Sequence, residues 1–300
     1  MRYLKKVIFI YGEELCPGEF RLLSTRLKDH HIDTKTMGGN GGKTALLEML
    51  GQSPDGTCES EGILWISSDK ESARVLSDMD FPVLGCVMGH MESYFGGVKY
   101  VCEDVADLEI EYLERVYRRY KGLPWDICET ARCVIRETTV ADVDAFYDIY
   151  KEPSITRYME NLFADPDEER AYAQDYIDKV YDFYGFGMWT VVLKETGQVI
   201  GRAGLSMREG FEEPELGFVI GVPWQNRRLA YEACLAIIFY GENALEFERI
   251  MALVEPGNRA SGALCEKLGF WPEDEITDGE RVYARYIRQS SCRQNDKIIR

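Results

Sequence analysis

Asn258–Phe270 reads N-R-A-S-G-A-L-C-E-K-L-G-F and follows a strand-like run, R-I-M-A-L-V, at Arg249–Val254. Asn is a good first residue for a helix because its short amide accepts hydrogen bonds from free backbone N–H groups. Leu264 and Leu268 then fall one helical turn apart on one face. Gly269 is expected to end the helix, since glycine readily adopts the left-handed conformation needed there. The stretch therefore predicts a strand, a capped helix, a turn and a return of the chain to the core.

The residues upstream predict the remaining elements of the same domain. Apolar runs indicate strands at 133–136, 187–193, 199–205 and 215–220, and helical spacing indicates helices after Thr139, after Asp165 and over 230–245. Thr139 with Asp142 three residues later has the form of a capping box, and Asp165-Pro166 is a typical helix start. Glu195–Gln198 predicts a hairpin turn between two of the strands.

Two further segments connect these elements to a known family. Glu215–Phe218 reads E-L-G-F, and Trp224–Ala230 reads W-Q-N-R-R-L-A. Together with the Asn-led helix they resemble the GNAT acyltransferase superfamily, in particular the branch that acetylates ribosomal-protein N-termini and related amines. Members of that branch read E-L-G-[YF] and then W-Q-[GN]-[KR]-G-[YL]-A. The order strand, two helices, three strands, helix, strand, helix is also the GNAT order, and the resemblance covers roughly residues 133–288.

The resemblance implies a mixed-sheet fold that binds acetyl-CoA as co-substrate and transfers acetyl to a primary amine, on a protein N-terminus or a small molecule, by direct attack on the thioester. A helix start suits the coenzyme pyrophosphate, because its backbone N–H groups are unpaired and carry partial positive charge. The family turn Q-x-x-G-x-[GA] maps onto residues 225–230. The implied cofactor-binding residues are Ile220, Val222, Gln225, Asn226, Arg227, Arg228, Leu229, Ala230, Asn258 and Ser261.

Arg228 stands where the family has Gly. Glycine lets the backbone approach a phosphate and take unusual torsions. An Arg side chain at this position either crowds the phosphate site or binds the phosphate through its guanidinium.

The transfer needs a base for the acceptor ammonium and an acid for the leaving thiolate. The three histidines all lie in the first half, so Glu215 is the best candidate base, with Glu213 and Glu209 as weaker ones. An exposed carboxylate without a catalytic role is the alternative for each. Cys265 occupies the position at which many relatives place a Tyr acid. It is a candidate proton donor, and a small buried helix residue is the alternative. No metal is implied.

The helix after Asp165 carries an aromatic stripe, Tyr172, Tyr176, Val180 and Phe183. Core packing is expected for most of the stripe. In GNAT folds this region borders the acceptor site, so one or two rings are expected to face substrate.

The first half predicts a small α/β domain. Apolar runs indicate strands at 7–11, 63–66, 82–87 and 98–102, and helices are expected at 20–27, 70–79 and 108–120. This alternation predicts a doubly wound parallel sheet, whose ligand edge would carry Glu13-Glu14, Ser67-Ser68-Asp69 and Gly89-His90. The order weakly resembles a reduced haloacid dehalogenase or receiver domain, but Tyr11–Glu14 lacks the D-x-D nucleophile. Gly38–Thr44 lacks the Walker spacing, because Met37 occupies the position of the first Gly.

The domains are therefore expected at 1–130, small and non-catalytic, and at 131–300, the acetyltransferase domain with a short basic tail. The 300 residues carry a net charge of −17 with acidic excess in both halves, which disfavours nucleic acid as a partner. No apolar run approaches the roughly 20 residues of a membrane helix. Nine scattered cysteines without a C-x-x-C pair predict free thiols in a reducing cytoplasm. A homodimer is compatible with the sequence.

Two other functions remain open. A GNAT-shaped pseudoenzyme that senses coenzyme A or recruits partners is favoured by Arg228 and by the missing Tyr. A hydrolase in the first half is disfavoured because its nucleophile is missing.

Overall fold

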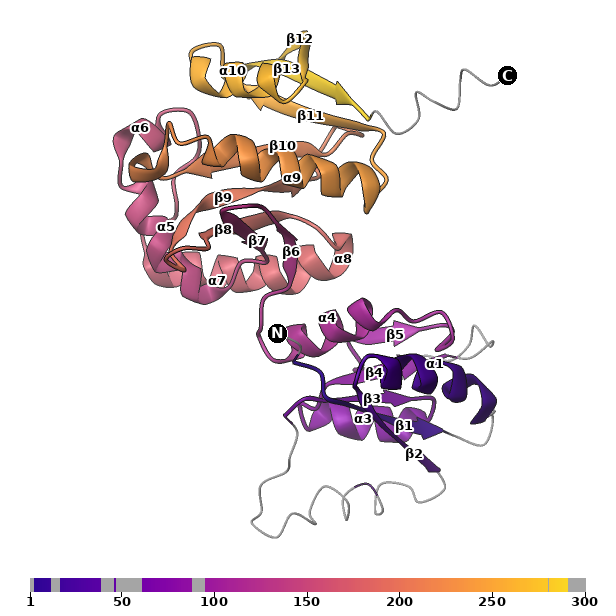
Figure 1. The fold of residues 1–300 in the computed structure, drawn as a ribbon. Coiled ribbons are helices and arrows are strands. Elements are labelled where there is room, and N and C mark those ends of the chain that lie inside the picture. Colours follow the sequence, from indigo (N-terminus) through magenta and orange to yellow (C-terminus); the bar gives the residue numbers. More distant parts are fainter. Residues whose placement is uncertain are drawn as a thin grey trace, which may run out of the picture. The chain divides into compact units, whose positions relative to one another are not determined.

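The computed structural model describes residues 3–11, 17–38, 46, 61–87, 95–279 and 281–290. The chain forms two compact units, Met1–Trp125 and Asp126–Arg300 (Figure 1). Glu13, Glu14, His90 and most of the Gly38–Thr44 loop lie outside the described residues.

The first unit contains five parallel strands in the order β2-β1-β3-β4-β5. Its elements are β1 (Lys6–Tyr11), α1 (Pro17–Asp29), β2 (Asp33–Gly38), β3 (Ile63–Ser67), α3 (Lys70–Asp78), β4 (Val83–Cys86), β5 (Tyr100–Cys102) and α4 (Ile110–Tyr120). This strand order is the flavodoxin-like doubly wound order.

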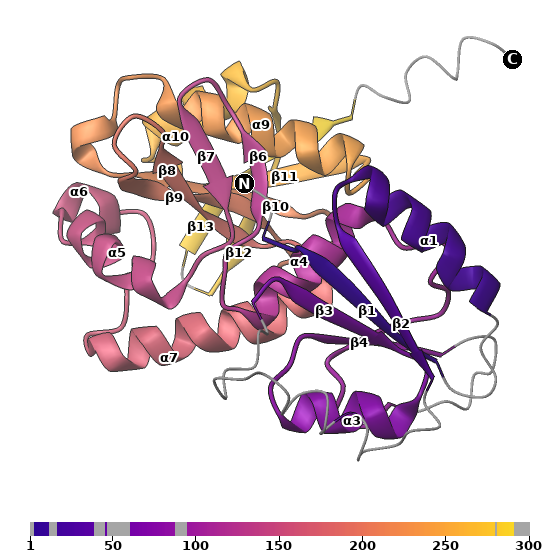
Figure 2. The same ribbon diagram turned by 60° about the horizontal axis from the view of Figure 1, so that its bottom comes forward.

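Helices cover both faces of this sheet, as Figure 2 shows. Alternate residues of β1 explain why: Val7 and Phe9 pack with α1 and α4, whereas Ile8 and Ile10 pack with α3. Strands β1, β3 and β4 are buried on both faces, so their sequences are continuous apolar runs. The predicted doubly wound parallel sheet is confirmed.

Strand β2 was not predicted, because its sequence is too polar for a buried strand. It lies at the sheet edge and pairs along its whole length with β1, from Lys6 opposite Asp33 to Tyr11 opposite Gly38. An edge strand has a neighbour on one side only, and most of its side chains here are exposed. Polarity is therefore compatible with strand formation at this position.

The second unit contains an eight-stranded sheet in the order β12-β13-β11-β10-β9-β8-β7-β6. Its elements are β6 (Asp126–Glu129), β7 (Cys133–Arg136), η2 (Val140–Asp142), α5 (Val143–Tyr150), α6 (Pro153–Thr156), α7 (Pro166–Tyr176), η3 (Ile177–Tyr181), α8 (Asp182–Tyr184), β8 (Met188–Leu193), β9 (Val199–Ser206), β10 (Glu215–Ile220), η4 (Val222–Trp224), α9 (Leu229–Asn243), β11 (Arg249–Val254), α10 (Arg259–Lys267), β12 (Trp271–Asp278) and β13 (Arg281–Gln289). Neighbouring strands are antiparallel except β10 and β11, which are parallel.

The two faces of this sheet carry different helices (Figures 1 and 2). Val219 of β10 packs with Phe146 and Tyr150 of α5. On the opposite face, Trp189 of β8 contacts Tyr240 of α9 in an edge-to-face ring pair. The predicted mixed α/β fold is confirmed, whereas β6 and the β12–β13 hairpin were not predicted.

The aromatic stripe packs differently from the prediction. Tyr172 is 49% exposed and Phe183 is 80% exposed, whereas Tyr181, outside the stripe, is buried. Residues Ile177–Tyr181 form a π-turn, which inserts one residue into the helical repeat. The apolar face therefore rotates after Tyr176, and Tyr181 replaces Val180 against the core.

Candidate functional site

Strands β10 and β11 separate soon after they begin. Their parallel pairing consists of Glu215 opposite Met251, supported by a 2.9 Å bond from the Met251 N–H to the Pro214 carbonyl. Beyond this point the described ladder pairs β10 with β9, and β11 with β13. The backbone N–H and C=O groups that β10 and β11 turn toward each other beyond this point are therefore available to a bound ligand, since such groups require hydrogen-bond partners. Glu215 stands at the closed end of this opening.

A tight turn connects the carboxyl end of β10 to α9. The Gln225 side-chain amide donates to the Ile220 carbonyl at 2.8 Å and closes the turn. Asn226 and Arg228 both have left-handed backbones, with φ of 59° and 61°. The first helical bond of α9 joins the Glu232 N–H to the Arg228 carbonyl at 3.0 Å. Alternating backbone handedness at a helix start gathers N–H groups into an anion-binding concavity.

Arg228 itself adopts the conformation that the family sequence reserves for Gly. Such torsions strain a non-glycine residue by roughly 1–2 kcal/mol. Its side chain is exposed and lines a cavity of about 970 Å³ between α9 and the β6–β7 turn. The backbone at Arg228 is therefore left-handed although the residue is not glycine.

Arg132 and Glu232 form a clamp that stabilises this turn and that the sequence did not predict. The Arg132 guanidinium donates to the Arg227 carbonyl at 3.1 Å and to the Glu232 carboxylate at 2.8 Å. The Arg132 N–H also donates to Glu232, at 2.8 Å. Burial opposes ionisation of Glu232, but bonds from Thr130 and Arg132 outweigh it and hold its pKa below the ordinary value. No sequence signal joins residues so far apart.

Helix α10 begins as predicted. The Asn258 side chain accepts from the Ser261 N–H at 3.2 Å, and Gly269 ends the segment with φ of 84°. Cys265 is completely buried, and burial raises the pKa of its thiol to about 12. The thiol is therefore protonated at neutral pH and enclosed by the core, a position that also suits a packing residue.

Glu215 is held in an ion pair at the start of β10. Its Oε2 is 3.1 Å from Arg208 Nη1, and its side chain is 19% exposed. Burial raises its pKa above the ordinary value, while the Arg208 cation opposes the rise. Glu213 instead pairs with Arg249 and Arg285 at 3.2 and 3.8 Å. Glu209 is exposed. Of the three candidate bases, Glu215 lies at the strand opening with a pKa shifted toward neutrality.

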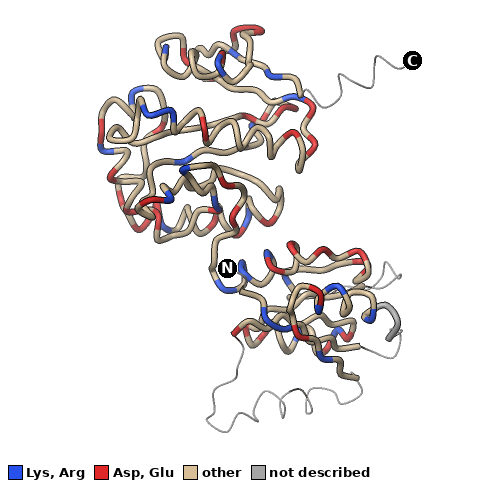
Figure 3. The backbone as a smooth tube through the Cα atoms, viewed as in Figure 1, with Lys and Arg blue, Asp and Glu red and all other residues tan. Residues whose placement is uncertain are grey.

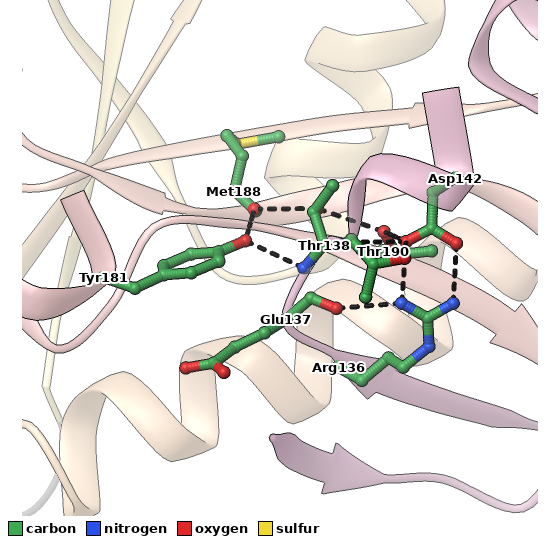
Figure 4. A network of polar contacts seen from close by, with 8 residues as sticks. Arg136, Glu137, Thr138, Asp142, Tyr181, Met188 and Thr190 are labelled. Atoms are coloured by element: carbon green, nitrogen blue, oxygen red, sulfur yellow. Dashed lines mark hydrogen bonds and ion pairs between the residues drawn. The ribbon is translucent and has the colours of Figure 1, made fainter. Parts of the chain in front are cut away.

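A buried polar network fixes the helices on one face of the sheet (Figure 4). By strand register and alternation, Glu215 and Thr190 point to this same face. Arg136 donates to both oxygens of Asp142 at 2.7 Å. Tyr181 donates to the Met188 carbonyl at 2.5 Å and accepts from the Thr138 N–H at 3.0 Å. Burial opposes ionisation of Asp142, but Arg136 overcomes it and holds the pKa of the carboxyl low. The network ties α5 and the π-turn to β7 and β8.

Asp142 also accepts from the Thr139 N–H at 2.8 Å, which confirms its part in the predicted capping box.

A ladder of rings lies on the α7 side of this face. Phe163, Tyr172, Tyr176 and Tyr181 contact one another in sequence with centroid spacings of 5.7, 6.3 and 5.4 Å, the first two pairs tilted and the last edge-to-face. Phe163 and Tyr172 remain about half exposed.

The described residues outside this site show neither a metal-ligand cluster nor a membrane-spanning helix. Asp69, at the ligand edge of the first sheet, accepts from the Ser72 N–H and caps α3. Within the described ranges, His, Cys, Asp and Glu side chains form no group of three suited to a metal. Lys and Arg are interspersed with Asp and Glu in both units (Figure 3). None of the helices in the described residues has the length and hydropathy to span a membrane.

Comparisons with known proteins concern the second unit. Residues 132–271 match the acetyltransferase (GNAT) domain. An uncharacterised N-acetyltransferase, p20 of Bacillus licheniformis, is 31% identical over 162 residues, which are 53% of this chain and 89% of the relative. The [ribosomal protein uS5]-alanine N-acetyltransferase of Escherichia coli is 39% identical over 98 residues, 32% of this chain and 48% of the relative.

Solved structures include a ribosomal-protein-S5-alanine acetyltransferase from Vibrio fischeri at 16% identity and a TM-score of 0.49, covering 55% of this chain and 97% of that chain. The match to residues 132–271 and the 31% identity to nearly the whole of p20 show that, through its second unit, this chain belongs to the GNAT acetyltransferase family.

Proposed function

We propose that the second unit transfers acetyl from acetyl-CoA to a primary amine, on a protein N-terminus or a small molecule. The observation that carries this proposal is the opening between β10 and β11 beside the N–H concavity at the start of α9. Acetyl-CoA, when bound, supplies an activated acetyl group whose transfer to nitrogen releases a thiol. The residues from Gln225 to Ala230 would hold its pyrophosphate, and the free edges of β10 and β11 its extended arm.

Within this proposal Glu215 takes the proton that the acceptor ammonium must lose before nitrogen can attack. A carboxylate with a raised pKa suits this role, because a base works best near the ambient pH. Cys265 is the proposed donor of the proton that the leaving sulfur needs. Its burial also fits the packing alternative, and only turnover of a variant separates the two.

The acceptor is proposed from the site alone to be cationic. Glu215 is a carboxylate at the strand opening, Phe163 and Tyr172 are half-exposed rings, and both carboxylates and ring faces attract ammonium groups. The E. coli relative is named an alanine N-acetyltransferase of a ribosomal protein, so peptides that begin with alanine belong in the first panel of acceptors.

The first test is a melting-temperature series with acetyl-CoA, followed by turnover on a panel of amines. Ligand at about 100 times its dissociation constant should stabilise the second unit by about 2.7 kcal/mol. Absence of any shift at millimolar acetyl-CoA would contradict the proposal. Binding without turnover on any amine would favour the alternative, a coenzyme-sensing module built on the same fold.

A further inference from the structure

Arg208 lies between the proposed base and a second carboxylate. Its Nη1 contacts Glu215 Oε2 at 3.1 Å, and its Nη2 contacts Asp278 Oδ2. Arg208 belongs to the β9–β10 loop, whereas Asp278 is the last residue of β12. The guanidinium therefore bridges the loop before β10 and the hairpin beside β11.

The Arg208 guanidinium is held from several directions. Besides the two carboxylates, it lies 5.8 Å from the centre of the Tyr283 ring. The Arg208 carbonyl accepts from the Phe211 N–H at 3.2 Å, which closes a turn through Gly210 with φ of 87°. Arginine is suited to this place because its planar fork serves two acceptors at once.

The ion pair uses only one oxygen of Glu215. Among the described residues Oε2 has the Arg208 contact, and Oε1 has neither a hydrogen bond nor an ion pair. Burial by itself favours the protonated carboxyl, which cannot accept a proton, and the Arg208 cation counteracts this. The neighbours of Glu215 on β9 and β11, Ser206 and Met251, are not ionisable, whereas the Asp278 carboxylate of β12 raises the pKa of Glu215.

We propose that Arg208, anchored by Asp278, is a positioning residue that holds Glu215 through Oε2 and leaves Oε1 to take the proton from the acceptor ammonium. In this step the N–H bond of the ammonium breaks, the proton forms a bond to Oε1, and the freed nitrogen pair becomes the nucleophile. The positive charge of the adjacent guanidinium also disfavours the protonated, cationic form of the acceptor amine, so it assists loss of the acceptor proton. This inference rests on the proposed function.

The test is the pH dependence of turnover in Arg208→Gln. Without the cation, the buried Glu215 should protonate at higher pH, so the acidic limb of kcat/KM should move upward. Activity at pH 6 should fall about tenfold or more, the size expected for a lost charged hydrogen bond, and should recover as pH rises. Arg208→Lys keeps the charge without the fork and should rescue part of the loss. Asp278→Asn removes a negative charge that raises the pKa of Glu215, so the acidic limb should move downward, whereas loss of the Arg208 anchor should lower kcat.

Arg285→Gln is the matched control. Arg285 of β13 also contacts several carboxylates, Asp274 at 2.8 Å and Glu273 at 2.6 Å on β12 and Glu213 at 3.8 Å, but does not contact Glu215. The acidic limb of the kcat/KM profile of Arg285→Gln should stay in place. Acetyl-CoA affinity, measured by calorimetry, should be unchanged in every variant.

A second readout needs no turnover. Carbon-13 NMR of Glu side chains in the ligand-free protein, with Glu215→Gln used to assign the signal, should show Glu215 titrating at higher pH in Arg208→Gln. If Glu215→Gln is inactive while Arg208→Gln leaves both the NMR titration and the rate profile unchanged, the positioning role is wrong and the base assignment stands. If Glu215→Gln retains full activity, the base assignment itself fails.

Discussion

Glu215 is the residue on which the proposed chemistry depends most directly. It lies where β10 and β11 part, and burial raises the pKa of its carboxyl while Arg208 limits the rise. A base must be ionised to act, so activity should be lost as pH falls through this raised pKa. The acidic limb should therefore lie above the ordinary Glu value of about 4.3.

Replacing Glu215 with Gln should lower turnover by about 10²–10⁴-fold, the usual contribution of a general base. The acidic limb should flatten, because the titrating group is gone. Acetyl-CoA affinity should barely change, since residue 215 is not in the phosphate turn. Glu213→Gln is the control: Glu213 pairs with Arg249 and Arg285 instead, so its loss should spare the limb. Full activity of Glu215→Gln with the fold intact would place the base elsewhere.

At the scale of elements, the turn from β10 into α9 has left-handed backbones at two residues that are not glycine. Asn226 and Arg228 are both left-handed, which glycine would adopt without strain. The question at Arg228 is therefore whether its guanidinium binds the pyrophosphate or only occupies space near it.

Arg228→Gly should weaken acetyl-CoA binding by about 1–3 kcal/mol, as expected when a charged hydrogen bond is removed. Asn226→Gly is the matched control, because it relaxes an equivalent backbone torsion without removing a charge. Calorimetry on the three proteins compares the two effects. Tighter binding in Arg228→Gly would show instead that the side chain crowds the site, and an unchanged affinity would contradict both accounts.

At the scale of the whole molecule, the two units differ in the candidate catalytic and binding groups that they carry. The second unit has an open strand pair, a helix start for an anion and a buried carboxylate. The described part of the first unit has a packed sheet whose edge residue Asp69 serves as a helix cap. We propose that the first unit is non-catalytic and serves packing or partner recognition.

Turnover of generic phosphoesters should accordingly stay at background in the full chain. Asp69→Asn is the informative variant, because Asn also caps helices well and the fold should be retained. It removes a carboxylate that a hydrolase would need, yet should change no rate. Reproducible phosphoester turnover that disappears in Asp69→Asn or Glu13→Gln would overturn the proposal.

Local signals in the sequence determined much of this fold. Asn258 and Asp165 cap their helices as predicted, and the strands at Cys133–Arg136, Glu215–Ile220 and Arg249–Val254 have the predicted bounds. Each signal lies within a few residues of the structure that it specifies, because caps, turns and apolar runs act through neighbouring backbone groups. The family resemblance, which the comparisons confirm, rests on these same segments.

Other features were decided by the tertiary structure. Polar β2 is a strand because β1 supplies its partner, and Tyr181 is buried because a π-turn rotates the helix face. The clamp from Arg132 to Glu232 and the bridge from Arg208 to Asp278 join residues far apart in the chain. Such contacts depend on which strands become neighbours and in what register, and no short segment encodes that. The sequence therefore suggested Glu215 as the candidate base, whereas the fold alone revealed the arginine that contacts it.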